Sequence, residues 1–334
     1  MLASGWLIVL FYITAMFLII LIGAFARRRD YLTATSTRLL SRFFVDFVFP
    51  AMVLTSLLRT IDPRSMSENF VLPLLGILII LVGMAVGWAM TPLSCRREQR
   101  PTFVFMVMLA NWIFLPLPIA QKLYGDDGVR AVLLINVGAQ LMLWTVGVWT
   151  LRGGKPDWRS LRNLATNPGM IATIAGIIIA LLVPLARTLE NAPLAALAGV
   201  LIPGKMLLTA LSMLGSITIP LSLIIIGSHL GGLPSAQLKP TRAVSGVVLT
   251  RLLLAPVASV ALLWLLHHLG LRISEHYRMV AYLIACMPVA VNASLFAEVF
   301  GGDTTLAACG IFYSTLLSII TVPVLFYAIQ VLKL

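Results

Sequence analysis

Two apolar stretches, half a chain apart, each carry an asparagine and prolines where an ordinary membrane helix would carry leucine. Residues 111–118 read NWIFLPLP and residues 287–293 read MPVAVNA. Proline removes a backbone donor and clashes with the carbonyl four residues back, so Pro116, Pro118 and Pro288 predict helix breaks. Inside a bilayer the freed carbonyls need protein or water as partners, so a break belongs beside a cavity. Paired breaks in the two halves of a chain predict a transporter's binding site.

Asn111 and Asn292 are the first candidates for substrate binding. An amide offers two donors and an acceptor, and at membrane depth these must be satisfied. In one interpretation each amide only bonds carbonyls that the prolines have freed. In the other, which we favour, each amide also contacts substrate. Two neutral amides and the partly positive N-termini of broken helices suit a carboxylate, and they release it more readily than a buried arginine would.

Arg251 and Asp46 lie inside apolar stretches, where an ionisable group is costly and is by default a functional hypothesis. For Arg251 the alternatives are a static ion pair, a side chain that snorkels towards the cytoplasm, or attraction of anions into an inner vestibule. For Asp46 they are a functional role or a local pair with Arg42, one helical turn away.

Three further polar residues could serve the site. Glu298 is either a proton or cation carrier or, in the favoured interpretation, an exposed carboxylate at a helix end. Gln140 and Ser314 would lie beside the broken helices, where polar side chains often only join helices to one another. We include both as candidate substrate contacts, since the breaks place them near the expected cavity.

Composition defines the class of protein. The chain has 334 residues, of which 60% are hydrophobic and 11% charged, and its mean hydropathy is +1.01. Soluble domains are about a quarter charged, so this is a polytopic membrane protein. The net charge of +12 is interpreted as a set of topology signals, not as a nucleic-acid surface.

The three cysteines and four histidines have no metal or disulfide spacing, and no nucleotide-binding or hydrolase motif occurs. We expect no cofactor, no metal and no enzymatic activity.

The apolar runs recur at the length that a bilayer core of about 30 Å requires. They predict an all-α protein with ten transmembrane helices, at residues 5–26, 39–58, 70–91, 102–123, 130–151, 168–187, 206–229, 243–266, 277–299 and 304–330. The first run lacks a basic segment before it, so we expect a helix and not a cleaved signal peptide. Residues 193–203 are apolar but too short to span, and predict an interfacial helix or an extension of the seventh span.

The distribution of Lys and Arg predicts the orientation. Of the 24 basic residues, the odd-numbered connections hold 14, namely Arg27, Arg28, Arg29, Arg38, Arg42, Arg96, Arg97, Arg100, Arg152, Lys155, Arg159, Arg162, Lys239 and Arg242. Nine lie on the opposite side, and Arg251 lies within a span. Because basic loops stay in the cytoplasm, both termini are expected outside it, in a bacterial inner membrane.

The two halves of the chain correspond in order and spacing. Pro50 in the second span matches Pro220 in the seventh, an offset of 170, and the YGDD sequence that ends at residue 127 matches the FGGD sequence that ends at residue 303, an offset of 176. Five spans per half make the repeats inverted. We therefore expect a first repeat over residues 1–151, a basic cytoplasmic linker over 152–167, and a second repeat over 168–334.

These motifs resemble the auxin efflux carrier family in its bacterial branch, and the resemblance covers essentially the whole chain. Span 4 has the family's spacing of Asn111, Pro118 and Gly125. Residues 141–147 resemble the family's span 5, and Pro220 and Gly227 match its span 7. The run from 287 to 302 is the span 9 signature, with Pro288, Asn292, Ala297, Glu298, Gly301 and Gly302. One departure is Pro116, at a position where the family usually has glycine.

The resemblance implies a scaffold of spans 1, 2, 6 and 7 and a transport domain of spans 3–5 and 8–10. Spans 4 and 9 would cross at their prolines, and Asn111 would be the substrate contact. Plant members export an anionic auxin and dimerise through the scaffold, and bacterial relatives are regarded as malonate or malate permeases. We expect an elevator-type carrier of a small organic anion. The alternatives are a sodium- or proton-coupled symporter of another solute and a membrane receptor that does not transport.

Overall fold

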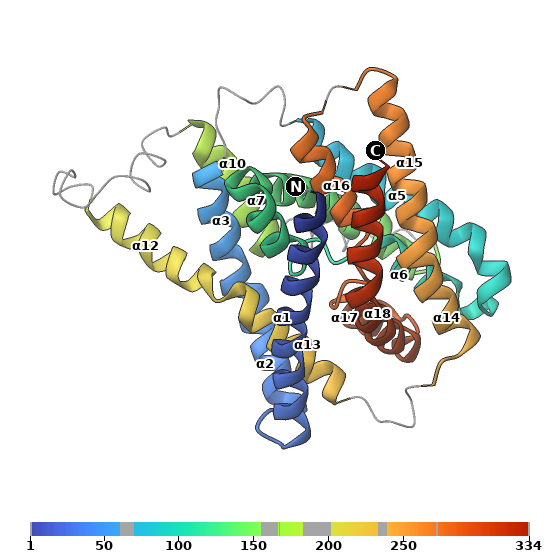
Figure 1. Ribbon diagram of the computed structural model, residues 1–334. Coiled ribbons are helices and arrows are strands. Elements are labelled where there is room, and N and C mark those ends of the chain that lie inside the picture. Colours follow the sequence, from blue (N-terminus) through green and yellow to red (C-terminus); the bar gives the residue numbers. More distant parts are fainter. Residues whose placement is uncertain are drawn as a thin grey trace.

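The protein is nearly all helical in a computed structural model that describes residues 2–60, 70–154, 166, 168–182, 202–232, 239–271 and 273–332 (Figure 1). The α-helices are α1 (Leu2–Arg28), α2 (Ala34–Phe43), α3 (Phe49–Thr60), α5 (Val71–Ser94), α6 (Arg100–Met108), α7 (Pro116–Met142), α8 (Val148–Leu151), α10 (Pro168–Leu182), α12 (Ile202–Ser216), α13 (Thr218–Gly231), α14 (Arg242–Leu249), α15 (Ala255–His268), α16 (Glu275–Ala285), α17 (Ala293–Phe300) and α18 (Thr304–Val331).

Three π-helical turns join neighbouring α-helices into longer rods. These turns are η1 (Phe44–Val48), η4 (Leu143–Gly147) and η7 (Thr250–Leu254). Each inserts an extra residue into a helical turn, a feature that is frequent at functional sites. The turn η1 directly precedes Pro50, whose ring cannot continue the regular bonding pattern. As a result α2 and α3 form one apolar rod from Ala34 to Leu58.

Seven of the described helical stretches are long and apolar enough to cross a membrane. They are Leu10–Arg28, Ala34–Leu58, Val71–Ser94, Pro116–Leu151, Ile202–Gly231, Arg242–His268 and Thr304–Val331. Six of them correspond to expected spans 1, 2, 3, 7, 8 and 10. The stretch Pro116–Leu151 takes in the second half of expected span 4 and all of expected span 5, which meet at the non-helical residue Gly125. Spans 4 and 9 are divided into shorter helices, and α10 is the described part of span 6. The described residues therefore establish a polytopic membrane protein, and ten crossings are a proposal.

Some expectations fall on residues that the structure does not describe. Most of the predicted linker, at 155–165 and 167, lies outside the described residues, and so does the end of the sixth span at 183–187. The predicted interfacial segment at 193–203 lies outside them as well, except for its last two residues, which are the start of α12.

The helices α1 and α13 lie against each other at very short range. Gly227 on α13 faces the backbone of Ile20, and Gly23 on α1 faces the backbone of Ile224, so a Cβ at either glycine would overlap the opposing chain. Small residues that let helix backbones approach are the usual means of helix association in membranes. This contact holds α1 and α13 together as a close-packed pair, and the two helices cross in Figure 1.

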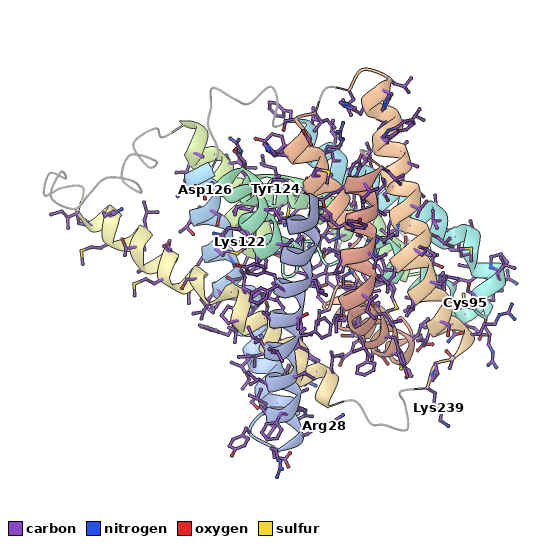
Figure 2. All side chains as sticks on the ribbon, in the orientation of Figure 1. Arg28, Cys95, Lys122, Tyr124, Asp126 and Lys239 are labelled. Carbon is purple, nitrogen blue, oxygen red and sulfur yellow. The ribbon has the colours of Figure 1, made fainter. Side chains whose placement is uncertain are left out.

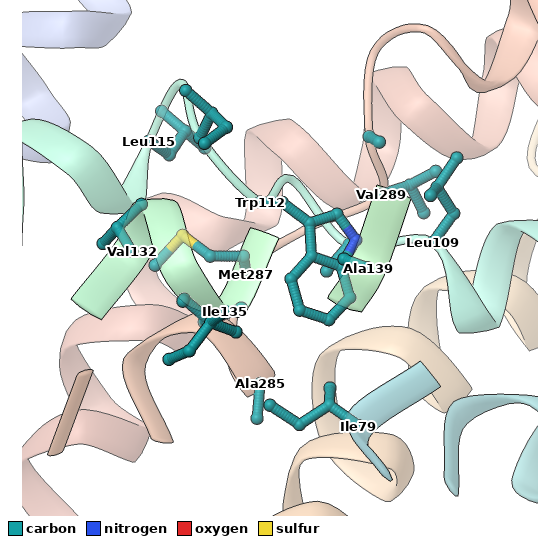
Figure 3. Close-up of a cluster of buried hydrophobic side chains, with 14 of the residues drawn as sticks. Ile79, Leu109, Trp112, Leu115, Val132, Ile135, Ala139, Ala285, Met287 and Val289 are labelled. Carbon is teal, nitrogen blue, oxygen red and sulfur yellow. The ribbon is translucent and has the colours of Figure 1, made fainter. Parts of the chain in front are cut away.

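The core of the protein lies around the two divided spans. Every residue from Met279 to Ala285 on α16 is buried, and α6 is buried from Thr102 to Met108. Figure 3 shows Trp112 and Met287 from the two divided spans among side chains of α5 and α7. Helices that are apolar on every side belong in the interior of a bundle. The divided spans are therefore enclosed by the others.

Some of the connections lie towards different ends of the bundle. In Figure 2, Arg28 and Lys239 lie towards the lower end, and Lys122, Tyr124 and Asp126 lie in the upper half. The first and seventh connections thus share one end, and the fourth lies nearer the other. The start of α1 and the end of α18 both lie in the upper half of Figure 1.

Candidate functional site

The first divided span is interrupted between Met108 and Pro116. The helix α6 ends at Met108, the backbone at Leu109 is extended, and α7 begins at Pro116. Pro116 is thus the first residue of the second half-helix, where a missing N–H has no helical partner to lose. We expected the prolines to break the helix where they stand. Instead the break precedes them, and they begin the following half-helix.

The second divided span is interrupted between Ala285 and Ala293. The helix α16 ends at Ala285, and α17 begins at Ala293, immediately after Asn292. After each second half-helix segment the chain turns at a glycine with positive φ, Gly125 at 59° and Gly301 at 79°. A side chain rarely adopts this conformation. The two glycines lie at corresponding positions of the two halves of the chain.

The two interruptions cross and pair with each other. Ala110 and Val289 form an antiparallel bridge. The N–H of Asn111 donates to the carbonyl of Pro288 at 2.8 Å, and the N–H of Ala290 donates to the carbonyl of Leu109 at 3.0 Å. Unwound backbone at membrane depth must be satisfied by protein or water, and here each interruption partly satisfies the other. The expected crossing of the two broken spans is therefore present.

Arg251 is held against both interruptions from η7. Its side chain is only 1% exposed. Its Nε donates to the carbonyl of Met287 at 2.9 Å, Nη1 to that of Val107 at 2.9 Å, and Nη2 to that of Ala285 at 2.5 Å. A guanidinium presents five donors in a fixed fork, which suits several carbonyls at once. Arg251 thus covers the partly negative C-terminal ends of α6 and α16.

This placement corrects the expectations for Arg251. It does not snorkel, because it is buried, and no carboxylate among the described residues pairs with it. It is absent from the residues that line the cavity described below, so the structure gives it no direct contact with that cavity. The partners of the Arg251 side chain are main-chain carbonyls, which our alternatives did not include.

Ser314, on α18, supports the second interruption. Its side chain is fully buried. Its hydroxyl accepts a hydrogen bond from the N–H of Val289 at 3.3 Å and donates to the carbonyl of Ile311 at 3.3 Å. It does not line the cavity, and neither do Pro116, Pro118 or Pro288. The structure therefore gives these four residues positions behind the cavity wall.

A cavity of about 760 Å³ opens beside the crossing. Asn111, Asn292, Gln140 and Glu298 all contribute to its lining, so the structure brings together four of the residues that the sequence singled out. Its walls come from the two interruptions and from α1, α2, η1, α3, α7, η4, α13, α17 and α18. Trp144 and Phe296 form an aromatic wall, with ring centroids 5.2 Å apart. The volume suits a small organic molecule.

Asn111 and Asn292 differ within this cavity. Asn111 is 2% exposed, and its Oδ1 accepts a hydrogen bond from the N–H of Phe114 at 3.0 Å. Asn111 thus stabilises the turn within the first interruption while it lines the cavity. Asn292 is exposed, and its side chain does not cap α17. This bond differs from the first interpretation, because the Asn111 oxygen accepts a backbone N–H and does not involve a freed carbonyl. It leaves the NH₂ group out, and contact of that group with substrate stays a prediction.

Asp46 lies outside the cavity lining and takes part in a local pair. Its Oδ2 is 3.4 Å from Nε of Arg42, one helical turn earlier, and the Arg42 side chain is largely exposed. Pairs of this kind contribute little to stability. The local pair that the sequence offered as one alternative is present, and nothing in the geometry connects Asp46 with a substrate.

Sequence reasoning missed a group of basic residues at the cavity. Arg27, Arg38 and His229 also line it. We interpreted the two arginines only as topology signals and considered the histidine only as a metal ligand. Nothing in the spacing of residues 27, 38 and 229 shows that they meet, because they come from three different helices.

The described residues give no indication of a metal centre. No group of three or more His, Cys, Asp or Glu side chains within them could hold a metal ion. Cys95, Cys286 and Cys309 form no disulfide.

Comparison with known proteins places the chain in a family. A family model described as "Membrane transport protein" matches residues 8–158 and 157–326. The chain belongs to the auxin efflux carrier family. The motifs around Asn111 and the run from Met287 to Gly302, on which the resemblance was based, coincide in the structure with the two crossing interruptions.

Three relatives of this auxin efflux carrier family protein extend the comparison. An uncharacterized transporter of Methanocaldococcus jannaschii is 22% identical over 317 residues, covering 91% of this chain and 94% of its own length. An uncharacterized transporter of Methanothermobacter thermautotrophicus is 24% identical over 318 residues, covering 93% and 95%. Protein PIN-LIKES 1 of Arabidopsis thaliana is 25% identical over 334 residues, covering 84% and 70%. The family and these relatives identify the chain as a membrane transport protein.

Proposed function

We propose that this protein is a secondary transporter of a small organic anion, in particular a carboxylate. The observation that carries the proposal is the crossing at the deep end of the cavity, where Asn111 and Asn292 are both part of the lining. Ligand sites of transporters are typically formed by discontinuous helices that meet near the middle of the bilayer.

The electrostatics of the crossing favour an anion. Four half-helix ends meet there, and the negative ends of α6 and α16 are already covered by Arg251. The N-terminal ends of α7 and α17, which begin at Pro116 and Ala293, carry partial positive charge. The N–H groups of Leu117 and Ala293 are already bonded to the carbonyls of Ile113 and Ala290, so the donors for an anion are the side-chain amides. The site therefore offers weak positive potential and amide donors without a free buried cation. Such a site binds a carboxylate and also releases it.

The transport movement that we propose is an elevator-type alternation. Spans 3–5 and 8–10 would move as one body against a scaffold of spans 1, 2, 6 and 7, and ten spans would form two inverted repeats. The corresponding turns at Gly125 and Gly301 and the pairing of the two interruptions support this arrangement. We further propose a homodimer through the scaffold, in a bacterial inner membrane, with both termini outside the cytoplasm.

The experiment that tests the function is a thermal-stability screen of the purified protein. Malonate, malate, succinate and indole-3-acetate are added separately, because a ligand that binds the folded state raises its apparent stability. We expect one acid to stabilise the wild type. Asn111→Asp is the informative variant, since it keeps the oxygen that accepts from Phe114 but replaces the NH₂ donors with negative charge. We expect it to fold and to lose the shift.

Ser314→Ala serves as the matched control, because Ser314 supports the crossing but does not line the cavity. It should keep the ligand-induced shift. Uptake of the same acid into proteoliposomes then separates transport from binding. An unchanged shift in Asn111→Asp would remove the central claim, and binding without counterflow would indicate a receptor.

A second candidate function is sodium- or proton-coupled symport. The observation that favours it is Glu298, an exposed carboxylate in the cavity lining. Uptake measured with and without a sodium gradient, and with and without a pH gradient, tests this alternative. Dependence on either gradient that is lost in Glu298→Gln would favour coupling through this residue.

A further inference from the structure

Three basic residues gather in the cavity lining away from the crossing. Arg27 is in the last turn of α1, Arg38 is in the middle of α2, and His229 is in the last turn of α13. We call Arg27, Arg38 and His229 the mouth cluster. Arg38 and His229 are exposed, whereas Asn111 at the crossing is buried. The cluster therefore lies where the cavity meets solvent.

The mouth cluster is held in place by contacts between its helices. Nη1 of Arg27 donates to the carbonyl of Leu32 at 3.1 Å, which fixes that side chain over the turn between α1 and α2. The hydroxyls of Thr37 and Ser228 lie 2.6 Å apart and join α2 to α13. The Ser41 hydroxyl is 3.3 Å from Nε2 of His229. These contacts bring the three basic groups together before any ligand arrives.

Arg38 is the member of the cluster that is available for a ligand. Among the residues that the structure describes, it has neither an ion pair nor a side-chain hydrogen bond. It points into a cavity whose other formally charged side chains are Arg27 and Glu298. His229 lies within electrostatic range of both. The mouth is thus positive on balance, although the crossing itself presents no free cation.

The backbone of Arg38 and the crossing lie at different positions along the cavity. Arg38 precedes Phe44 by six helical residues, which corresponds to about 9 Å along the axis. The Phe44 ring in turn lies 5.2 Å from the ring of Phe114, which belongs to the first interruption. The backbone of Arg38 is therefore offset from the first interruption by roughly two turns of helix, and we infer that the two places hold an anion at different steps.

We propose that the mouth cluster is a second anion subsite, which captures a carboxylate from solution before it reaches the crossing. This inference rests on the proposed function, because it concerns the same solute and cavity. A cavity lined by one sign of charge concentrates ions of the opposite sign and raises their rate of entry, and the effect falls with ionic strength. The subsite thus adds longer-range attraction to the weak positive potential of the crossing.

Arg42 provides a matched control for Arg38. Both are exposed arginines on α2, one turn apart, and both contribute equally to the charge that orients the chain. Arg42 pairs with Asp46 and is not part of the cavity lining. A role limited to membrane topology predicts the same effect for Arg38→Gln and Arg42→Gln. A subsite in the cavity predicts an effect for Arg38→Gln alone.

The test is initial uptake of radiolabelled malonate into proteoliposomes, or of whichever acid among malate, succinate and indole-3-acetate is transported. At about 20 mM ionic strength, where screening is weak, we expect Arg38→Gln to raise KM roughly five- to tenfold with Vmax within about twofold. The difference should shrink at about 200 mM. Arg38→Lys should retain most of the wild-type KM, and Arg42→Gln should match the wild type.

The outcomes separate the two proposals. If the wild type transports none of the acids, the proposed function fails, and the subsite fails with it. If transport occurs but Arg38→Gln and Arg42→Gln have the same KM, only the subsite is refuted. Vesicles of neutral phosphatidylcholine, and vesicles that also contain phosphatidylglycerol, distinguish the source of the anion. An effect of Arg38→Gln confined to the anionic vesicles would assign the cluster to a lipid headgroup and overturn the proposal.

Discussion

Arg251 donates from Nε to the carbonyl of Met287 at 2.9 Å, and the same guanidinium donates to Val107 and Ala285. One side chain on η7 therefore joins the ends of two helices that are far apart in the sequence. Because carbonyls without donors are costly inside a membrane protein, this side chain is part of what makes two interrupted spans tolerable.

Replacement of Arg251 should destabilise the fold. Arg251→Met fills similar space but leaves three buried carbonyls without these donors, and we expect it to cost about 3–5 kcal/mol. In detergent the midpoint of thermal unfolding should fall by roughly 6 °C or more. Arg251→Lys should lie between, because an ammonium cannot reproduce the planar fork. A midpoint for Arg251→Met equal to that of the wild type would show that the carbonyls have other partners.

The antiparallel bridge between Ala110 and Val289 predicts a specific cross-link. The two bonds that flank this pair make it a non-hydrogen-bonded pair, with Cα atoms about 4.5 Å apart. This separation lies within the range of disulfides. In a background without Cys95, Cys286 and Cys309, the double variant Ala110→Cys and Val289→Cys should oxidise, as measured by thiol labelling. Ala110→Cys with Val291→Cys is the control, since that diagonal pair is about 7–8 Å apart.

The same cross-link tests the proposed movement. Both interruptions belong to the body that we propose moves as a unit, so the oxidised protein should still transport. Uptake before and after reduction, compared within one preparation, gives the answer. Loss of transport on oxidation and its recovery on reduction would mean that the two interruptions separate during the cycle, contrary to an elevator-type movement.

Variants of Ser314 and Gln140 should change different quantities, the stability of the fold for Ser314 and the affinity for the acid for Gln140. Ser314→Ala leaves the N–H of Val289 without this acceptor and should lower stability by about 1–2 kcal/mol, with the Kd for the acid unchanged. Gln140→Ala alters the cavity lining and should weaken binding with little effect on thermal unfolding. Titration calorimetry and thermal unfolding on both variants measure the two quantities. The reverse pattern would show that Ser314 reaches the substrate.

The close contact of α1 and α13 predicts a steric effect at Gly227. Gly227→Ala places a Cβ against the backbone of Ile20, so the helices must separate, at a cost of about 1–3 kcal/mol. We expect a lower midpoint of thermal unfolding. Ala85→Leu, at an exposed position of α5, adds more atoms without an opposing backbone and should leave the midpoint unchanged.

The broken spans could be predicted from the sequence because the signal is local. Proline and asparagine inside an apolar run identify a helix break wherever they occur, and two such runs identify the pair that crosses. The register could not be predicted. The chain contains no local indication that the break precedes Pro116, or that Ala110 faces Val289, because these depend on how the two halves dock.

The roles of single polar residues were harder to predict. Ser314 and Gln140 look equivalent in sequence, yet one bonds to the backbone and the other lines the cavity. For Arg251 and Arg38 the structure reverses our expectation. We considered Arg251 for anion attraction, but its side chain is bonded to three carbonyls, whereas Arg38, which we interpreted only as a topology signal, is available for a ligand. Burial and partners are set by packing between distant helices, and residue type alone does not specify them.

The buried guanidinium also has a consequence for the response to voltage. Arginine keeps its charge in proteins, and in the proposed cycle Arg251 travels with the crossing. Arg251 then adds one positive charge to the empty body in the membrane field, and a bound monoanion offsets the contribution of this residue. A potential acts on a charge with about 2.3 kcal/mol per 100 mV for a full crossing. Through Arg251, membrane voltage would therefore act more on the return of the empty carrier than on the step that moves the anion.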